Sequence, residues 1–286
     1  MEVCINIGGV SFLVNSEFEI LIEKEFLPFL SDRNALGDVR VKVTCEKNEI
    51  LTPQGCKRGE DLLSEYFIED GQLVCLTKGG VDGYISKTVC DEEFSELECV
   101  IYERHIQSMR KLGAILRLIP MNMILQKKGI LFFHASQIET HGKGILFTAP
   151  SGTGKSTQAK LWKKYRDARI ICNDRTLVRE GKTYGYPVDG SEPVRSGEVL
   201  SLGAIVLLGQ GKENTIERLP KKEAVKRVLP QLVIAFWDPM ARVEAMEQII
   251  SLLENYPIYF LNCIPEESAV QCLEQQLIYD GVLENA

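Results

Sequence analysis

A glycine-rich segment in the middle of the chain has residue types and spacing suited to holding phosphate. Residues 149–157 match the Walker A pattern at Gly154, Lys155 and Ser156, with Ala149 where the first glycine usually stands. Glycines let the backbone curl around phosphate and present N–H donors at a helix start. The lysine would reach the β and γ phosphates, and the serine hydroxyl would bind Mg²⁺. The nucleotide-binding residues that we expect are Ser151, Gly152, Thr153, Gly154, Lys155, Ser156 and Thr157.

The elements around this segment favour the same interpretation. An apolar strand at 145–148 precedes it and a helix at 157–165 follows it, which is the strand, loop and helix order that such a site needs. A Mg²⁺–nucleotide site also needs carboxylate oxygens. Asp174 follows the predicted strand Arg169–Cys172, at the end that delivers side chains into the crevice of an α/β sheet. A simple Asn-Asp turn is the other interpretation of this position.

The first hundred residues show a different pattern. Short apolar runs alternate with polar turns up to about Tyr102, which predicts a β-rich part. From His105 to about Gln126 the apolar residues recur at helical spacing, which predicts a long amphipathic helix kinked near Pro120. We therefore divide the chain into a β-rich part, 1–104, and a nucleotide-binding catalytic domain, 105–286, although no linker marks the boundary.

The remainder of the chain alternates predicted strands and helices. Apolar runs at 130–133 and 145–148 are separated by a polar segment that suits a hairpin or a short connection. Further strands are predicted at 183–187, 204–208 and Ile258–Cys263, and helices at 221–229, 240–253 and Glu267–Tyr279. The fold class that we expect is α/β with an α+β extension.

Composition limits the function classes. Of 286 residues, 45% are hydrophobic and 26% are charged, as in a globular protein, and the net charge of −7 argues against nucleic acid as a partner. No apolar stretch reaches the ~18 residues of a membrane helix, and the opening residues do not resemble a secretory signal. Nine cysteines without a Cys-x-x-Cys pair indicate reduced thiols. We expect a cytoplasmic protein with no membrane partner.

Three segments together resemble HPr kinase/phosphorylase and the smaller proteins related to its catalytic domain. They are residues 131–136 (Leu-Phe-Phe-His-Ala-Ser), the loop at 149–157, and residues 172–175 (Cys-Asn-Asp-Arg). The resemblance implies a P-loop kinase domain, similar in fold to phosphoenolpyruvate carboxykinase. It also implies that His134 pairs with the catalytic acid Asp174, and that Lys155 and Arg175 assist in catalysis.

The chain departs from that family at one position. HPr kinase has two adjacent aspartates, whereas here Asn173 replaces the first and Asp174 keeps the second. Asparagine cannot accept a proton. Either Asp174 serves both the acceptor and the metal, or catalysis has been lost. The segment 184–192 resembles the acceptor side of the kinase-like relatives, so Glu192 is a candidate metal ligand, although a polar surface loop explains it equally well.

These observations predict a kinase that uses ATP and Mg²⁺ to phosphorylate a hydroxyl, on a peptide, a protein or a small metabolite. The β-rich part would recognise the acceptor. A nucleotide-binding regulatory module without catalysis is the alternative, and ATP is the default nucleotide. A carboxykinase and a GTPase lack their motifs here. HPr kinase assembles from several subunits, so a homo-oligomer and a monomer both stay open.

Overall fold

The computed structural model describes residues 1–31, 37–80, 83–187 and 197–284, and packing divides the chain into two compact units. Unit 1 comprises Met1–Lys128 with Ala235–Pro239, and unit 2 comprises Gly129–Ile234 with Met240–Ala286. The division therefore lies after Lys128 and not near residue 104. The mixed α/β character with large sheets agrees with the fold class expected from the sequence.

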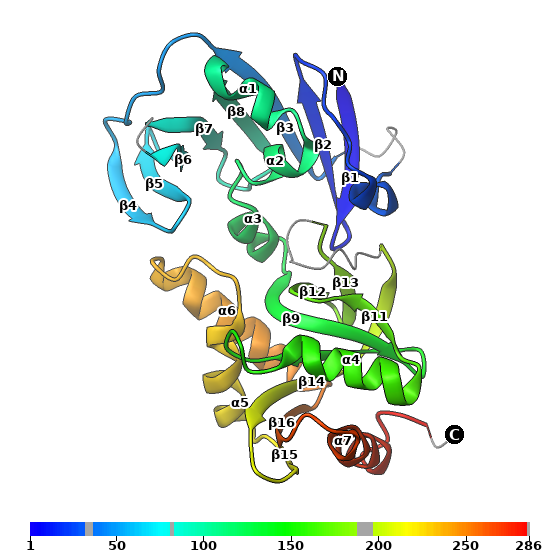
Figure 1. Ribbon diagram of the computed structural model, residues 1–286. Helices are drawn as coiled ribbons and strands as arrows, with labels where there is room; N and C mark the ends of the chain where they lie inside the picture. Colours follow the sequence, from blue (N-terminus) through cyan, green and yellow to red (C-terminus); the bar gives the residue numbers. More distant parts are fainter. Residues whose placement is uncertain (32–36, 81–82, 188–196, 285–286) are drawn as a thin grey trace. The chain divides into compact units, whose positions relative to one another are not determined.

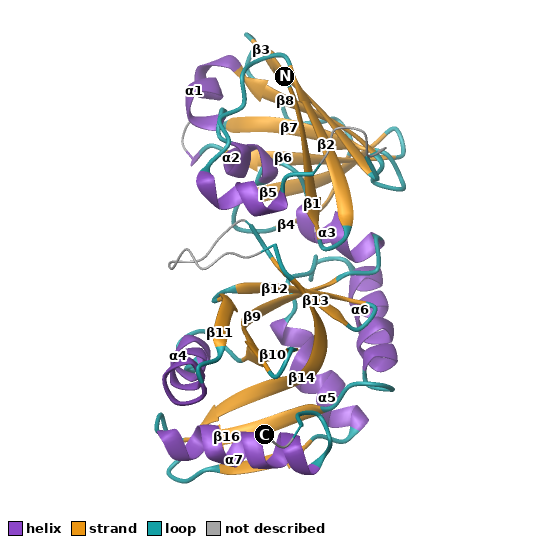
Figure 2. Ribbon diagram, turned by 90° about the vertical axis from the view of Figure 1, so that its right-hand side faces the viewer, coloured by secondary structure: helices purple, strands orange, loops and turns teal. Residues whose placement is uncertain are grey.

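Unit 1 is built on one sheet, as the β-rich pattern predicts (Figures 1 and 2). Its strands run in the order β1-β2-β3-β8-β7-β6-β5-β4; β3 is parallel to both β2 and β8, and the other neighbours are antiparallel. In β3, Val39, Val41 and Val43 are buried between exposed basic residues, the two-residue period of a strand with one face in the core. The strands are β1 (Glu2–Ile7), β2 (Val10–Ser16), β3 (Val39–Glu46), β4 (Cys56–Glu60), β5 (Ser64–Glu69), β6 (Gln72–Lys78), β7 (Tyr84–Cys90) and β8 (Glu96–Tyr102).

The prediction of one long helix at 105–126 is wrong. The structure has the short helices η3 (Glu103–His105), α1 (Ile106–Met109), α2 (Leu112–Leu116) and α3 (Met121–Lys127). The break arises because Leu21 accepts a hydrogen bond from the N–H of Leu112 and donates one to the carbonyl of Arg110, so these groups cannot serve a continuous helix. The segment belongs to unit 1, where the Thr88 hydroxyl donates to the Leu118 carbonyl at 2.8 Å.

A segment from late in the sequence also packs in unit 1. Residues Ala235–Pro239 belong to it, and the Trp237 ring stacks on Tyr66 with centroids 5.0 Å apart. A Cβ on Gly59 would lie 2.3 Å from the Trp237 indole, so only glycine fits beneath this ring. The chain therefore enters unit 1 twice.

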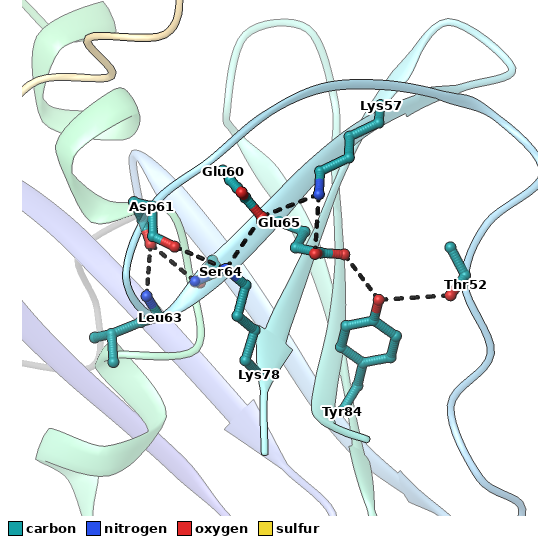
Figure 3. A network of polar contacts seen from close by, with 9 residues as sticks. All are labelled: Thr52, Lys57, Glu60, Asp61, Leu63, Ser64, Glu65, Lys78 and Tyr84. Carbon is teal, nitrogen blue, oxygen red and sulfur yellow. Dashed lines mark hydrogen bonds and ion pairs between the residues drawn. The ribbon is translucent and has the colours of Figure 1, made fainter. Parts of the chain in front are cut away.

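A cluster of charged side chains ties β4 to β7 in unit 1 (Figure 3). Lys57 Nζ lies 3.0 Å from Glu60 and 2.9 Å from Glu65, Lys78 Nζ lies 3.3 Å from Glu60, and the Tyr84 hydroxyl donates to Glu65 at 2.8 Å. Both lysines are thus already paired with carboxylates. The cluster has no spare positive charge to attract phosphate, and exposed pairs of this kind contribute little to stability.

Unit 2 has a mixed sheet in which β10, β14 and β16 run parallel. The order is β10-β9-β12-β13-β14-β16-β15, β11 pairs with β9, and β10 also pairs with β14. The strands are β9 (Leu131–Thr140), β10 (Lys143–Thr148), β11 (Arg169–Cys172), β12 (Arg175–Arg179), β13 (Lys182–Gly185), β14 (Val199–Gln210), β15 (Thr215–Arg218) and β16 (Ile258–Cys263). The carboxyl ends of the parallel strands lie at one edge of the sheet, where α/β proteins place ligands.

Helices cover both faces of this parallel core. Along β10, Ile145 and Phe147 face one cluster and Leu146 faces the other, so the strand is apolar on both sides. One cluster includes residues of α4 (Lys155–Arg166) and α7 (Glu267–Tyr279), and the other includes residues of α5 (Lys221–Val228) and α6 (Pro239–Leu252) (Figure 1). None of the described helices combines the length and apolar character needed to cross a membrane.

Two turns of unit 2 offer a matched test of the packing. Gly142 and Gly181 both have φ of +70°, but a Cβ on Gly142 would meet nothing within 4 Å, whereas one on Gly181 would lie 1.8 Å from the Tyr256 hydroxyl. We expect Gly142→Ala to cost about 1–2 kcal/mol through backbone strain. Gly181→Ala should cost a further ~1–3 kcal/mol because the Tyr256 ring must move. Urea unfolding of both variants measures the difference, and equal losses would contradict the clash.

Candidate functional site

The Walker A segment forms a loop between β10 and α4. Gly152 has φ of +79° and Gly154, at the helix start, has φ of +115°, conformations that other residues rarely adopt. Ala149 is fully buried in the core cluster that contains Trp162. Its methyl group therefore packs inward, which explains why the loop tolerates alanine there. Around it, Ser151, Gly152 and Thr157 are exposed, and Thr153, Gly154 and Ser156 are half-buried.

The Lys155 amine lies inside this loop. Its Nζ donates hydrogen bonds to the carbonyl of Ala149 at 2.9 Å and to the carbonyl of Pro150 at 3.4 Å, and the residue is 8% exposed. Burial lowers the pKa of Lys155, while the negative charge of Asp174 acts in the opposite direction. The loop thus holds a poorly solvated cation close enough to Asp174 to feel its charge.

A histidine within β9 meets a carboxylate that directly precedes β12. Antiparallel pairing sets Arg175 opposite His134, and the N–H of Ala135 donates to the Asp174 carbonyl at 3.0 Å. This register brings His134 Nε2 to 3.1 Å from Asp174 Oδ1. The hydrogen bond from His134 lowers the pKa of Asp174 most; burial opposes this, and the charges of His134, Arg175 and Lys155 add to the lowering. Asp174 is therefore an ionised carboxylate at neutral pH.

Arg175 supplies the second cation. Its Nε lies 3.7 Å from Asp174 Oδ2, and its guanidinium carbon lies 5.6 Å from the centroid of the Phe132 ring. Phe132 in turn packs on Tyr186 with centroids 4.6 Å apart. The aromatic ring fixes the guanidinium beside the carboxylate without neutralising it. The structure thus brings Lys155, His134, Asp174 and Arg175 into one electrostatic cluster.

Comparison with known proteins places the chain in a family. Residues 97–276 match the family model described as SynChlorMet cassette protein ScmC, which is more than half of the chain. The chain belongs to the ScmC family. The match includes the loop, His134, Asp174 and all of α1 to α3. No curated protein matches the sequence.

Two buried hydroxyls in this ScmC-family chain support the cluster, and no sequence motif predicted their roles. The Ser136 hydroxyl donates to the Asn173 carbonyl at 2.9 Å, and the Thr148 hydroxyl donates to the His134 carbonyl at 2.9 Å. Both side chains are fully buried. They fix the backbone on either side of the His134–Asp174 contact, so they position the pair without touching a ligand.

The remaining candidates contribute less. Glu192, with its neighbours Asp189 and Arg195, lies outside the described residues. Within the described ranges no three His, Cys, Asp or Glu side chains are grouped to hold a metal ion. Mg²⁺ in nucleotide sites commonly binds one or two protein side chains, substrate phosphates and water, so Ser156 and Asp174 fit this sparse set. None of the candidate residues in the described ranges lines a second cavity, of 340 Å³, beside Tyr256.

The His134–Asp174 contact makes a testable prediction about pH. In His134→Leu the pKa of Asp174 should rise toward its ordinary value of about 3.9, because leucine has no donor and the largest lowering contribution is lost. The lowered pKa of Asp174 stabilises the ScmC-family fold at pH values above the ordinary pKa of aspartate. This stabilisation is lost as the pH falls through the pKa that Asp174 has in the folded protein. Carboxyl ¹³C NMR titration of both proteins measures the change.

Asp91 in unit 1 is the internal control for that titration. The pKa of Asp91 is lowered, because hydrogen bonds from Ser95 and from the Glu96 N–H outweigh the opposing effect of burial. His134 makes none of these contacts. The pKa of Asp91 should be the same in both proteins. An unchanged pKa of Asp174 in the variant would contradict the predicted contact.

Proposed function

We propose that this chain is a kinase that uses ATP and Mg²⁺ to transfer the γ-phosphoryl group to a hydroxyl, through a P-loop domain resembling those of HPr kinase and phosphoenolpyruvate carboxykinase. The observation that carries the proposal is the proximity of a buried loop lysine to an ionised carboxylate paired with histidine. Phosphoryl transfer requires mainly positioning and charge neutralisation, and these groups offer both.

Each residue has a role in the proposed reaction. The loop N–H groups and Lys155 bind the phosphates, and Arg175 stabilises charge on the group in transfer. The acceptor oxygen forms a bond to the γ phosphorus while the bond to the β–γ bridging oxygen breaks, leaving ADP. The acceptor proton passes to Asp174. His134 is hydrogen-bonded to Oδ1 of this carboxylate, so Oδ2 is the oxygen that receives the proton. Ser156 and Asp174 would hold Mg²⁺, which supplies charge neutralisation when bound.

The acceptor is proposed by class. A peptide or protein serine or threonine and a small hydroxylated metabolite suit the same chemistry, and the β-rich unit 1 is the proposed place for recognising it. The net charge of −7 disfavours nucleic acid as the acceptor. We propose a cytoplasmic setting, because the reaction requires ATP.

A nucleotide-binding regulatory module is the second candidate. It is favoured by a single observation, the amide of Asn173 beside Asp174, where a second carboxylate would serve as base. In that case the loop would bind ATP without transferring phosphate. The two candidates differ in turnover and not in binding.

Transfer of ³²P from γ-labelled ATP with Mg²⁺ tests the proposal. The protein is incubated with lysate from its source, which is then separated into protein and small-molecule fractions, and wild type is compared with Lys155→Ala. Label that depends on Lys155 is the expected result, and the labelled fraction identifies the acceptor class. Intact ATP binding by calorimetry with no label in either fraction would favour the regulatory module.

A further inference from the structure

A second feature of unit 2 adjoins the phosphate loop. A cavity of 280 Å³ opens between the loop, the first turn of α4 and the carboxyl ends of β14 and β16. The Gln210 side chain crosses from β14 to the loop, where its Nε2 donates to the Gly152 carbonyl at 3.3 Å. The cavity therefore has the phosphate loop as one wall and the sheet edge as the other.

The cavity and the charged cluster use different parts of the loop. Gly152, Thr153 and Gly154 line the cavity, whereas Lys155, His134 and Asp174 do not. A triphosphate held by the loop has two ends, and its γ end must reach Asp174 for transfer. The other end, which carries the sugar and base, is then directed away from Asp174. The cavity is a space of suitable size on the loop for that end.

The walls of the cavity suit a base better than another phosphate. Leu208, Cys263 and Pro265 supply apolar and polarisable surface, and none of the described residues that line the cavity is a lysine or an arginine. One polar side chain indicates that the cavity binds a ligand. Gln158 lines the cavity and is only 3% exposed. Its Nε2 donates to Cys263 Sγ at 3.2 Å, and its Oε1 has no hydrogen-bond partner within the described part of the chain. A buried carbonyl oxygen of this kind needs a donor.

We propose that this cavity binds the nucleoside end of the phosphoryl donor, with Gln158 and Cys263 contacting the base or sugar. The inference rests on the proposed function in taking a nucleoside triphosphate as the ligand. It goes beyond that function in assigning residues from β16, about a hundred positions after the loop, to nucleotide recognition. The unsatisfied oxygen of Gln158 then finds its donor on the nucleoside.

Thiol labelling of the wild-type protein tests the site directly. Iodoacetamide modification of Cys263 is followed by peptide mass spectrometry with ATP, with inorganic tripolyphosphate or with neither. ATP should slow labelling of Cys263 by about tenfold, and tripolyphosphate should not, because it lacks a nucleoside. Cys272, on α7 and outside the cavity lining, is the control and should label at one rate throughout. Equal labelling of Cys263 with saturating ATP and without it would overturn the proposal.

Two variants give an independent readout by calorimetry. Cys263→Phe fills the cavity and Gln158→Leu removes its buried amide, so each should weaken ATP binding about tenfold while tripolyphosphate binding changes by less than about twofold. Gln158→Leu keeps the side-chain size, so it serves if Cys263→Phe fails to fold. Unchanged ATP affinity in a folded variant would overturn the proposed subsite.

The outcomes separate this inference from the kinase proposal. Protection of Cys263 by ATP without any phosphoryl transfer would support the subsite and reject the kinase. Transfer that depends on Lys155, with Cys263 unprotected, would support the kinase and reject the subsite. A wild-type protein that binds tripolyphosphate but not ATP would reject both.

Discussion

Lys155→Met should reduce phosphoryl transfer on the order of 10²- to 10³-fold, because it removes the cation that neutralises the transferring phosphate. Binding of ATP should weaken as well, since the loop amine is lost. The readout is ADP formation at saturating Mg²⁺–ATP without acceptor, in which water takes the acceptor's place, together with calorimetry of ATP binding.

The same substitution should leave unit 2 folded. Burial lowers the pKa of Lys155, which means that burial disfavours the charged form in the folded state. Replacing the cation with an apolar side chain removes this penalty and loses the hydrogen bonds to the carbonyls of Ala149 and Pro150. These effects oppose one another, so the melting temperature should change by no more than about 4 °C.

Lys163→Met is the matched control for this prediction. Lys163 lies on the same helix, α4, but is exposed and is not among the residues that line the cavity. Its replacement should leave both transfer and ATP binding within about twofold of wild type. A Lys155→Met protein that keeps full activity would exclude the loop lysine from the proposed chemistry. One that unfolds while the control does not would contradict the expected stability.

Local sequence pattern was sufficient to predict those elements whose structure depends on interactions between neighbouring residues. The strand Ile258–Cys263 and the helix Glu267–Tyr279 have the bounds expected from their apolar spacing. The loop at 149–154 lies between a strand and a helix, because glycine is needed where φ is positive and the following residues favour helix. Asp174 follows β11 as predicted. The contact of Asp174 with His134 was expected only from the family resemblance.

The sequence failed where distant segments decide the outcome. The helix break at Arg110 depends on pairing with Leu21, about ninety residues earlier. The polar segment after Phe133 was interpreted as a hairpin or a short connection, and β9 and β10 do form an antiparallel hairpin. The first strand is longer than its apolar run, because β9 continues to Thr140 and its buried Gln137 amide donates to the Thr183 hydroxyl at 2.6 Å. The cavity was missed for the same reason, since parallel pairing of β10, β14 and β16 brings its walls together.

Asp174→Asn should lower transfer by about 10²- to 10⁴-fold if the carboxylate accepts the acceptor's proton. The asparagine side chain has nearly the same shape but cannot take a proton at neutral pH. ATP binding should fall much less than turnover, because Lys155 and the loop N–H groups remain. The measurement is kcat against ATP affinity in the same preparation. Unchanged turnover would exclude Asp174 as the base, and no turnover in wild type would favour the regulatory module.

A double-mutant cycle with His134→Gln then decides how the histidine acts. His134 bonds Oδ1 of Asp174, so we expect it to work through this carboxylate, with a loss of about tenfold alone and no further loss when Asp174 is already asparagine. Independent, additive losses would instead place His134 in direct contact with the phosphate or the acceptor. Because Asn173 leaves one carboxylate here where HPr kinase has two, this coupling determines whether Asp174 with His134 is sufficient for catalysis.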